Sequence, residues 1–371
     1  MKKEIAIIGA GPSALMLACE LNPEKFSVTI YERNAAPGRK FLVAGKGGFN
    51  LTHSENIDEF KKKYTPSKFL INALDNFSNT DLRTWLKEKE IETYVGTSKR
   101  VFPVKGIKPI QVLNVFENEL KRRNVSVQTN HKWIGWNENN ELIFETKDTT
   151  KIVKADTVVF ALGGGSWKVT GTDGGWLNLF SEKGIECSPF IPSNCAYKVD
   201  WKNAVNGVEG EALKNCSFSV NDVIKKGEAV LTKFGIEGGA IYALSKEIRE
   251  RLLSNKNAVL QIDFKPETEI AKIIQLLSEK GKHTVKDILS EKLKLSAAQI
   301  SLLKNMTIKE EYNDPATLAR LIKNFPINLT DFAPVDEAIS TVGGINLHEV
   351  DKNYQLIKLP YQYCIGEMLD W

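Results

Sequence analysis

Apolar and polar positions in the N-terminal segment are arranged in a way that predicts a strand, a helix and a second strand. Glu4–Ile8 is an apolar strand candidate, Pro12–Leu21 has the composition of a helix, and Ser27–Glu32 is another strand candidate. Glycines at turn spacing separate the first strand from the helix. This order is a compact βαβ unit, the building block of an α/β domain.

Further along the chain, the pattern adds helices, a meander and two more core strands. Residues 81–90 and Pro109–Arg123 have helical periodicity, and residues 133–154 alternate like an antiparallel meander. Asp156–Leu162 is nearly all apolar, as strands buried in a parallel sheet are. Tyr361–Ile365 is the last core strand candidate. The predicted fold class is therefore α/β with a parallel central sheet.

Between these parts the character of the sequence changes. Short β-like pieces predict a β-rich lobe at 191–266, and helical periodicity with many lysines and glutamates predicts a helical lobe at 267–325. Sequence of β character returns at 326–345. The α/β domain is accordingly predicted to be assembled from residues 1–190 and 346–371.

The composition is that of an ordinary globular protein. Of 371 residues, 42% are hydrophobic and 26% are charged, and the formal net charge is +4. Basic runs such as residues 61–63 are short and have no interleaved aromatic residues, so no nucleic-acid partner is expected. The five cysteines form no Cys-x-x-Cys pair and the four histidines show no i,i+4 spacing, so neither disulfides nor a metal site is expected.

The N-terminus imitates a secretory signal, because Lys2 and Lys3 precede an apolar run. That run is interrupted by Glu4 and by the glycines of the turn, which suits a strand and a helix better than a signal core. No later stretch approaches the roughly 18 apolar residues of a membrane span. We therefore expect a cytoplasmic protein without a membrane partner.

A dinucleotide-binding fingerprint occupies the turn between the first strand and the helix. Gly9 permits the tight turn, Gly11 lets the backbone approach a pyrophosphate, and Ala14 keeps helix and strand close. The N-terminus of the helix then favours the negative phosphates. Glu32, at the end of the second strand, is placed to accept hydrogen bonds from the adenosine ribose. The candidate cofactor-binding residues here are Gly9, Ala10, Gly11, Pro12, Ser13, Ala14, Glu32 and Arg33.

Two elements far from the fingerprint favour FAD over NAD. A second glycine-punctuated strand runs from Val158 to Gly164, where backbone can approach the middle of the cofactor. Gly366–Asp370 follows the last strand, and an acid there can hold the ribityl hydroxyls. An NAD-only domain needs neither element. The candidate cofactor residues outside the fingerprint include Val127, Ala161, Gly163, Gly164, Gly366, Glu367 and Asp370.

Longer motifs give the chain a family resemblance. Beside the fingerprint, these motifs are Gly38–Phe41, Ala44–His53, Ala161–Trp167, Gly235–Tyr242, Thr341–Gly344 and Gly366–Asp370. With this set, the sequence resembles the NAD(P)/FAD-dependent oxidoreductases grouped with bile-acid reductases and aminoacetone oxidases. The resemblance spans nearly the whole chain, and it is closest to a branch of that group with no settled substrate.

The resemblance implies an FAD domain of the two-dinucleotide-binding type, built from both ends of the chain and interrupted by the two lobes. It also implies that the Arg39–Asn50 loop lines the cofactor, with Arg39 and Lys40 near phosphate or ribityl oxygens. Many relatives carry arginine and cysteine where this chain has Gly48 and Phe49, so no role of that arginine or thiol transfers. The other candidate cofactor residues of the loop are Gly47, Gly48 and Asn50.

The expected function is that of an FAD-dependent oxidoreductase acting on a small molecule. The flavin carries the redox chemistry. It is reduced by the substrate or by NAD(P)H as a transient electron donor, because no second dinucleotide fingerprint is present. A cleft between the flavin and the β-rich lobe is the expected substrate site. Its candidate lining residues, none of them assigned a catalytic role, are Trp167, Lys233, Tyr242 and Thr341.

Two other classes of function stay open at this point. One is a flavoenzyme that acts on nucleic acid, such as a tRNA-modifying enzyme, although the sequence has no concentrated basic face. The other is a flavin-binding protein without catalytic activity. Reduction of the flavin by NADH or NADPH separates these classes from a reductase.

The last expectation concerns the end of the sequence. In the group that the chain resembles, the Gly-Glu-x-Leu-Asp element is followed by a helix whose N-terminus points at the flavin ring. This sequence stops at Trp371, directly after that element. A helix N-terminus stabilises negative charge, so we expect the second part of the FAD domain to be truncated and this form to bind FAD weakly.

Overall fold

The computed structural model of the chain divides into two units. The first contains Met1–Ile191 and Thr341–Trp371, and the second contains Pro192–Ser340. The structure describes residues 1–43, 49–279 and 281–371. The first unit is therefore assembled from both ends of the chain.

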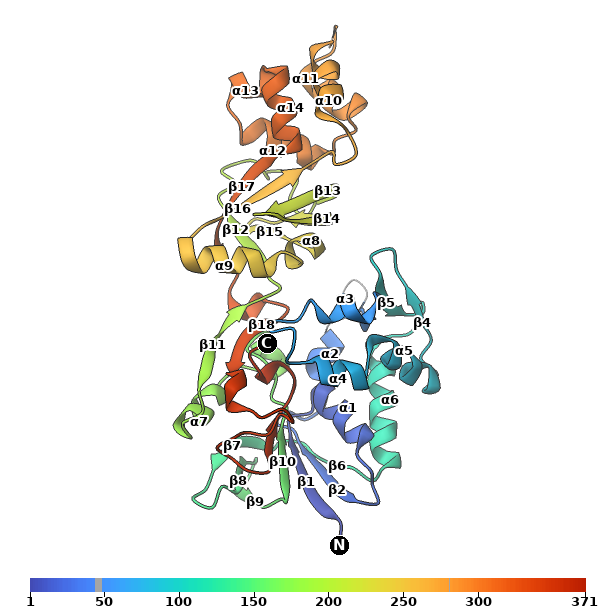
Figure 1. Ribbon diagram of the computed structural model, residues 1–371, viewed down its shortest axis with the longest axis vertical. Coiled ribbons are helices and arrows are strands. Elements are labelled where there is room, and N and C mark those ends of the chain that lie inside the picture. The colour runs from blue at the N-terminus through green and yellow to red at the C-terminus, as the bar shows by residue number, and fades with distance from the viewer. Residues whose placement is uncertain (44–48, 280) are drawn as a thin grey trace. The chain divides into compact units, whose positions relative to one another are not determined.

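A five-stranded parallel sheet forms the centre of the first unit (Figure 1). In β1, Ile5 and Ile7 belong to one hydrophobic core, whereas Ala6 and Ile8 belong to another. Successive side chains of a strand point to opposite faces, so the unbroken apolar run reflects burial on both faces. In spatial order the strands are β19 (Gln362–Cys364), β10 (Thr157–Phe160), β1 (Lys3–Ile8), β2 (Phe26–Tyr31) and β6 (Ser126–Gln128).

Helices cover one face of this sheet, and an antiparallel meander with one helix covers the other (Figure 1). The first layer holds α1 (Pro12–Glu20), α5 (Asn79–Glu88) and α6 (Pro109–Arg122). There, Trp85 of α5 stacks on Phe116 of α6 with ring centroids 5.1 Å apart. The opposite layer holds β7 (Lys132–Trp136), β8 (Leu142–Glu145), β9 (Thr150–Val153) and α7 (Trp176–Glu182). The predicted α/β fold with a parallel central sheet is confirmed.

Smaller elements complete the first unit. A three-stranded sheet and a two-stranded sheet lie outside the central sheet, in the orders β3-β5-β4 and β11-β18. These smaller elements are α2 (Arg39–Val43), β3 (Thr52–His53), α3 (Ile57–Lys61), α4 (Ile71–Asn76), β4 (Thr93–Val95), β5 (Arg100–Pro103), β11 (Cys187–Pro192) and β18 (Thr341–Ile345).

The second unit is built on a closed barrel of six strands. The pairing of β12 with β17, which joins Tyr197 to Phe332, closes it. Closure leaves no free sheet edge. Around the barrel the strands are β12 (Tyr197–Val199), β15 (Gly235–Glu237), β14 (Val223–Leu231), β13 (Ala212–Val220), β16 (Ala258–Asp263) and β17 (Phe325–Phe332).

Most helices of the second unit lie in the chain between β16 and β17, and they share one hydrophobic core with the barrel. Ser301 Oγ donates to the carbonyl of Ala204 at 2.7 Å, and Gln299 Nε2 lies 3.2 Å from Cys216 Sγ. The helices of this unit are α8 (Gly239–Tyr242), α9 (Ser245–Asn255), α10 (Ile270–Ser278), α11 (Val285–Asp287), α12 (Ala297–Asn305), α13 (Lys309–Asn313) and α14 (Pro315–Lys323).

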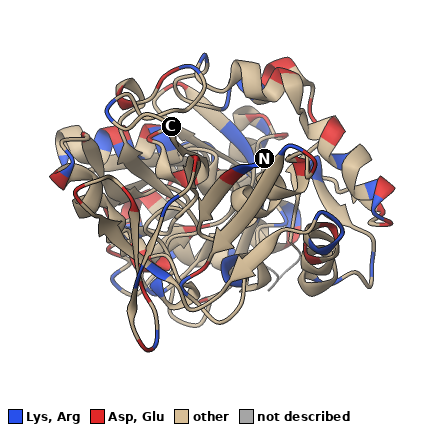
Figure 2. Ribbon diagram, turned by 90° about the horizontal axis from the view of Figure 1, so that it is seen from below, with Lys and Arg blue, Asp and Glu red and all other residues tan. Residues whose placement is uncertain are grey.

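Two features of the structure concern possible nucleic-acid and membrane partners, namely the distribution of charged residues and the lengths of the helices. Figure 2 shows segments of lysine and arginine interspersed with segments of aspartate and glutamate along the ribbon. Within residues 1–43, 49–279 and 281–371, no helix has the length and apolarity that crossing a bilayer requires.

Candidate functional site

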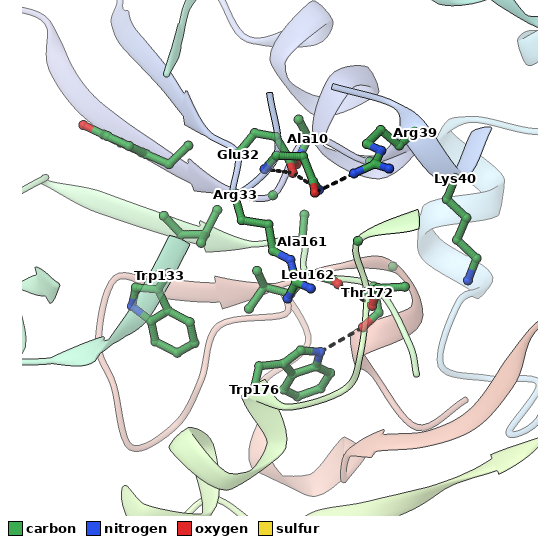
Figure 3. Close-up of a pocket in the computed structure, with 18 of the residues that line it drawn as sticks. Ala10, Glu32, Arg33, Arg39, Lys40, Trp133, Ala161, Leu162, Thr172 and Trp176 are labelled. Atoms are coloured by element: carbon green, nitrogen blue, oxygen red, sulfur yellow. Dashed lines mark hydrogen bonds between the residues drawn. The ribbon is translucent and has the colours of Figure 1, made fainter. Parts of the chain in front are cut away.

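A cavity of about 640 Å³ opens in the first unit where β1, β2 and β10 end. Ligands of open α/β sheets bind at the carboxyl ends of the strands, so this is the expected place for a cofactor. Figure 3 shows the cavity between the end of β2 above and Trp176 below. The predicted residues that line it are Gly9, Ala10, Gly11, Pro12, Ser13, Glu32, Arg33, Arg39, Lys40, Ala161, Gly163, Gly366 and Glu367.

Two glycines of the fingerprint are needed for different reasons. Gly9 has a φ of +98°, and a Cβ on it would lie 2.6 Å from the carbonyl oxygen of Ala161. The fold itself therefore requires glycine at this position. Gly11 has a φ of −78°, and a Cβ on it would meet no protein atom within 4 Å. Nothing in the described protein requires glycine there, so the open space beside Gly11 is suited to a ligand.

The N-terminus of α1 borders the cavity next to these glycines. Gly11 is its N-cap, Pro12 is its first residue and Ser13 lines the cavity. At the first position of a helix the backbone N–H has no acceptor within the helix. Proline, which lacks an N–H, therefore loses no hydrogen bond there. Ala14 is fully buried and does not line the cavity, because it packs in the core between α1 and the sheet. The end of the helix supplies the partial positive charge that attracts an anion.

Glu32 lies at the end of β2 with 8% of its surface exposed. Its Oε2 accepts a hydrogen bond of 2.9 Å from the backbone N–H of Ala10. Its Oε1 accepts hydrogen bonds from the backbone and the side chain of Asn34, at 2.8 and 2.6 Å. The carboxylate is thus held in one orientation while it lines the cavity.

Two arginines reach the cavity from neighbouring segments. Figure 3 shows the Arg33 side chain extending from the end of β2 toward Trp176. Its Nη1 lies 3.1 Å from Asp173 Oδ2. Arg39 of α2 donates to Asn34 Oδ1 at 2.9 Å and to the carbonyl of Val169 at 3.2 Å. These contacts fix both guanidinium groups at the wall of the cavity.

Lys40 joins α2 to the C-terminal element. Its Nζ lies 2.8 Å from Ser166 Oγ and 3.4 Å from Glu367 Oε2. The side chains of Lys40 and Glu367 are 29% and 33% exposed. Two predicted residues from opposite ends of the sequence therefore form an ion pair at the cavity.

The segment after β10 is fixed by hydrogen bonds to its backbone. Trp176 Nε1 donates to the carbonyl of Gly163 at 3.1 Å, as Figure 3 shows. The backbone N–H of Leu162 points at Met368 Sδ, 3.1 Å away. Thr172 Oγ1 lies 3.1 Å from the carbonyl oxygen of Leu162 and also contacts the carbonyl of Gly164. This backbone is therefore ordered where it borders the cavity.

Several lining residues were not among the sequence predictions. His131 and Trp133 follow the end of β6, so their place after a parallel strand could have indicated them. Leu162 lies inside a predicted glycine-rich motif and Trp371 directly follows another, whereas the remaining residues enter the wall through tertiary packing. The additional lining residues include His131, Trp133, Ile134, Leu162, Thr172, Asp173, Trp176, Leu179 and Trp371.

Some predicted cofactor residues lie elsewhere. Val127 packs against the hydrophobic core between the central sheet and helices α1, α5 and α6. Asp370 Oδ1 accepts a hydrogen bond from the backbone of Gly343 at 2.9 Å. A Cβ on Gly164 would lie 2.3 Å from Thr341 Oγ1, so a side chain there would displace this hydroxyl. Within the described chain, the residues Ala14, Asn50, Val127, Gly164 and Asp370 do not line the cavity. Gly47 and Gly48 lie outside the described residues.

The four candidate substrate residues are divided between the two units. Trp167 and Thr341 belong to the first, where Thr341 Oγ1 accepts a hydrogen bond of 3.2 Å from the N–H of Gly165. Lys233 and Tyr242 belong to the second. The Lys233 side chain is 86% exposed, and the phenol of Tyr242 lies 3.4 Å from Glu237 Oε2. Burial, followed by the Glu237 charge, raises the pKa of Tyr242 to about 12.

One group of possible metal ligands occurs in the described part of the chain, namely Glu186, His348 and Glu349. The buried carboxylate of Glu349 already accepts from Lys358 Nζ at 2.8 Å and from the backbone of Glu186 at 2.9 Å. His348 Nε2 lies 3.1 Å from Glu186 Oε2. The lysine neutralises the most buried acid. Ion pairs and hydrogen bonds within the protein therefore explain why these three side chains lie together.

Comparison with known proteins identifies the class of this chain. The model of the HI0933-like protein Rossmann domain family matches residues 3–371. The chain therefore belongs to this family, and its fold is of the Rossmann type, which confirms the predicted resemblance. A curated relative is the 3-dehydro-bile acid delta(4,6)-reductase of Clostridium scindens, 26% identical over 275 residues. That match covers 72% of this chain and 66%, just under two thirds, of the reductase.

Similar solved structures include a dehydrogenase and a fumarate reductase. The 3-ketosteroid-delta4-(5alpha)-dehydrogenase of Rhodococcus jostii RHA1 is 11% identical, with a TM-score of 0.49 over 99% of this chain and 91% of that one. A flavocytochrome c3 fumarate reductase in its open conformation is 13% identical, with the same TM-score over 99% of this chain and 73% of that one.

Proposed function

We propose that this chain binds FAD in the cavity of the first unit and acts as an FAD-dependent oxidoreductase on a small molecule. The observation that carries the proposal is the open space beside Gly11. Its negative φ is available to any residue, and no protein atom lies within 4 Å of the place of a Cβ. Glycine at this position serves the approach of a bound group, as in other dinucleotide sites.

The residues around this space fit the adenosine diphosphate half of FAD. The N-terminus of α1 suits the pyrophosphate, and the carboxylate of Glu32 suits the ribose hydroxyls. Arg33 and Arg39 add positive charge at the same wall. The acidic Asp173 and the amide of Asn34 hold these guanidinium groups in place.

The part of the cavity wall formed by Lys40 and Glu367 also fits FAD. Their ion pair would lie beside the ribityl chain of the bound cofactor, where hydroxyls need both donors and acceptors. The cavity volume of about 640 Å³ is in the ordinary range for cofactor sites. When bound, the flavin supplies the hydride and electron transfer chemistry, and these residues supply binding and orientation.

The direction of the reaction is proposed from the curated relative. That protein is named a reductase, so we infer that this chain also passes electrons from a donor through the flavin to an organic substrate. The sequence has one dinucleotide fingerprint, which FAD would occupy. A nicotinamide donor would therefore bind transiently at the flavin and leave before the substrate enters.

Anaerobic mixing of the flavin-loaded protein with NADH and with NADPH tests this function. We expect one of them to bleach the visible absorbance of the flavin, and a small-molecule acceptor to restore it. The Gly11→Val protein, which should carry no flavin, controls for oxidation of nicotinamide by anything else in the sample. If dithionite bleaches the flavin but neither nicotinamide nor any organic substrate does, the oxidoreductase assignment is wrong.

A further inference from the structure

The side chain of Asn34 lies between two charged residues of the cavity wall. Its Nδ2 donates to Glu32 Oε1 at 2.6 Å, and its Oδ1 accepts from Arg39 Nη1 at 2.9 Å. All three residues line the cavity, and Figure 3 shows the side chains of Glu32 and Arg39 near each other at its upper wall. No ion pair joins Glu32 directly to Arg39, both of which belong to the described residues. The amide of Asn34 is therefore a bridge between a carboxylate and a guanidinium.

This bridge requires a group with a donor at one end and an acceptor at the other. An ionised carboxylate only accepts hydrogen bonds and a guanidinium only donates them, whereas an amide carries both an NH2 group and a carbonyl oxygen. The NH2 group of Asn34 must therefore face Glu32, and its oxygen must face Arg39. Because the amide has no net charge, it leaves the charge of each neighbour uncompensated.

The segment after β10 holds the bridge in place. Gly171 has a φ of +117°, and a Cβ on it would lie 2.4 Å from Asn34 Nδ2, so the backbone of this segment lies against the amide. Arg39 Nη2 donates to the carbonyl of Val169 at 3.2 Å. On the other side, the backbone N–H of Asn34 donates to Glu32 Oε1 at 2.8 Å. These contacts restrict the rotation of the amide and keep the two charged groups apart.

We propose that Asn34 is a positioning residue, which keeps Glu32 and Arg39 from pairing with each other so that both stay available to one bound nucleotide. The inference rests on the proposed function, in which Glu32 meets the ribose and Arg39 adds positive charge for the pyrophosphate. An arginine paired directly with a carboxylate forms two parallel hydrogen bonds. Such a pair would occupy the acceptors and donors that the nucleotide needs. Asn34 thus acts on affinity through its two neighbours.

The first test is the pH dependence of ADP binding to the apoprotein of Asn34→Asp. A protonated carboxyl group has a donor and an acceptor, as the amide has. The ionised form has no donor, repels Glu32 and pairs with Arg39. Because the new carboxyl group lies close to that of Glu32, it keeps its proton to higher pH than an isolated one. We expect the affinity of the variant relative to the parent to fall by about tenfold or more between pH 4.5 and pH 8.

The control for this test is Asn139→Asp, which changes an exposed residue of the same unit. Its affinity for ADP should follow that of the parent at every pH. The titration of ADP itself affects all proteins alike, so the ratio of affinities isolates the substituted residue. The other charged or titratable side chains of the wall, which the variants share, include Arg33, Lys40, His131, Lys132, Asp173 and Glu367.

A double-mutant cycle covers the case in which Asn34→Asp fails to fold. Asn34→Ala removes the bridge and lets Arg39 pair with Glu32, so the affinity for ADP should fall by about tenfold. In the background of Arg39→Met, which removes the pairing partner, the same change should cost less than about threefold. If Asn34 only supported the local structure, the loss would be equal in both backgrounds.

The outcomes separate this role from the proposed function. If the parent and Asn139→Asp bind no ADP, the proposed function fails and the role of Asn34 fails with it. If the parent binds ADP, the role alone is overturned by either of two results. One is a folded Asn34→Asp protein whose affinity relative to the parent stays constant with pH. The other is an Asn34→Ala loss that is the same with and without Arg39.

Discussion

The backbone N–H of Ala10 donates a 2.9 Å hydrogen bond to the carboxylate of Glu32, so the end of β2 holds the glycine turn that precedes α1. The same carboxylate lines the cavity. Glu32 therefore orients the phosphate-binding turn and is also available to the ribose. Its hydrogen bonds to Asn34 leave no freedom for the side chain to turn away.

Replacing Glu32 with glutamine should weaken FAD binding by roughly tenfold to a hundredfold. The amide must turn its NH2 group toward an N–H of Ala10 or Asn34, and a buried polar group left unsatisfied costs about 1–3 kcal/mol. The measurement is a flavin fluorescence titration of the apoprotein. The exposed residue Glu24 supplies the control variant Glu24→Gln, with unchanged affinity. An unchanged dissociation constant for Glu32→Gln would remove this residue from the site.

Substitutions of the two fingerprint glycines should have different effects, one on FAD binding and the other on the stability of the fold. Gly11→Val should abolish FAD binding and leave the melting temperature of the apoprotein nearly unchanged, because a Cβ at this position meets no protein atom within 4 Å. Gly9→Ala should destabilise the fold by about 1–3 kcal/mol, because of its positive φ and the carbonyl of Ala161. Flavin content and thermal melts of both apoproteins decide this. A Gly11→Val protein that keeps one FAD per chain contradicts the assignment of the cavity.

Local sequence was sufficient for the strands of the central sheet and for helices α1, α5 and α6. The apolar segments 4–8, 156–162 and 361–365 are strands of the central sheet in the structure, because a strand buried on both faces leaves an unbroken apolar run. Gly9, Ala10, Gly11, Pro12 and Ser13 of the fingerprint line the cavity, whereas Ala14 is buried in the core. Their spacing is dictated by a turn of only a few residues, which a single sequence reveals.

The closure of the barrel and the remaining residues of the cavity wall depend on contacts between distant segments, which no local sequence pattern encodes. Closure of the barrel joins Tyr197 to Phe332, and neither segment carries a signal for the other. Thr172 and Trp176 reach the cavity wall only because they bind carbonyls of the segment after β10.

A charged network on α6 gives a pH-dependent prediction. Glu119 has a 6% exposed side chain, and it contacts Arg122, Arg123 Nε at 2.7 Å and Lys89 Nζ at 3.2 Å. These contacts, that of Arg122 foremost, lower the pKa of Glu119 from its ordinary 4.5 to about 2. Because the folded-state pKa lies below the unfolded one, the network stabilises the fold above pH 4.5, and this contribution is lost as the pH falls toward 2.

Glu119→Gln should therefore lower the free energy of unfolding by about 1–3 kcal/mol at neutral pH, with the difference from the parent shrinking between pH 4.5 and 2. Urea titrations across this range provide the measurement. Glu117, on the same helix, makes no hydrogen bond or ion pair with a described residue, so Glu117→Gln is the matched control. A stability difference that stays constant down to pH 2 would show that the loss comes from packing alone.

Removal of the helices between β16 and β17 should leave flavin binding intact. Ile262 pairs with Phe325, so replacing residues 263–324 with Asn-Gly connects the two strands through a two-residue hairpin loop. The predicted cofactor residues all belong to the first unit. We expect unchanged flavin stoichiometry and a lower melting temperature of the second unit, since the barrel loses part of its core. A folded variant without flavin would contradict this.

The central claim is that the cavity binds FAD through its adenosine diphosphate half. Equilibrium titration of the apoprotein with FAD and with FMN, which lacks the adenosine and one of the two phosphates, tests it most directly. The account predicts that FAD binds at one per chain, that ADP competes with it, and that FMN does not bind in the same concentration range. Equal binding of FMN and FAD, or no competition by ADP, would contradict the account.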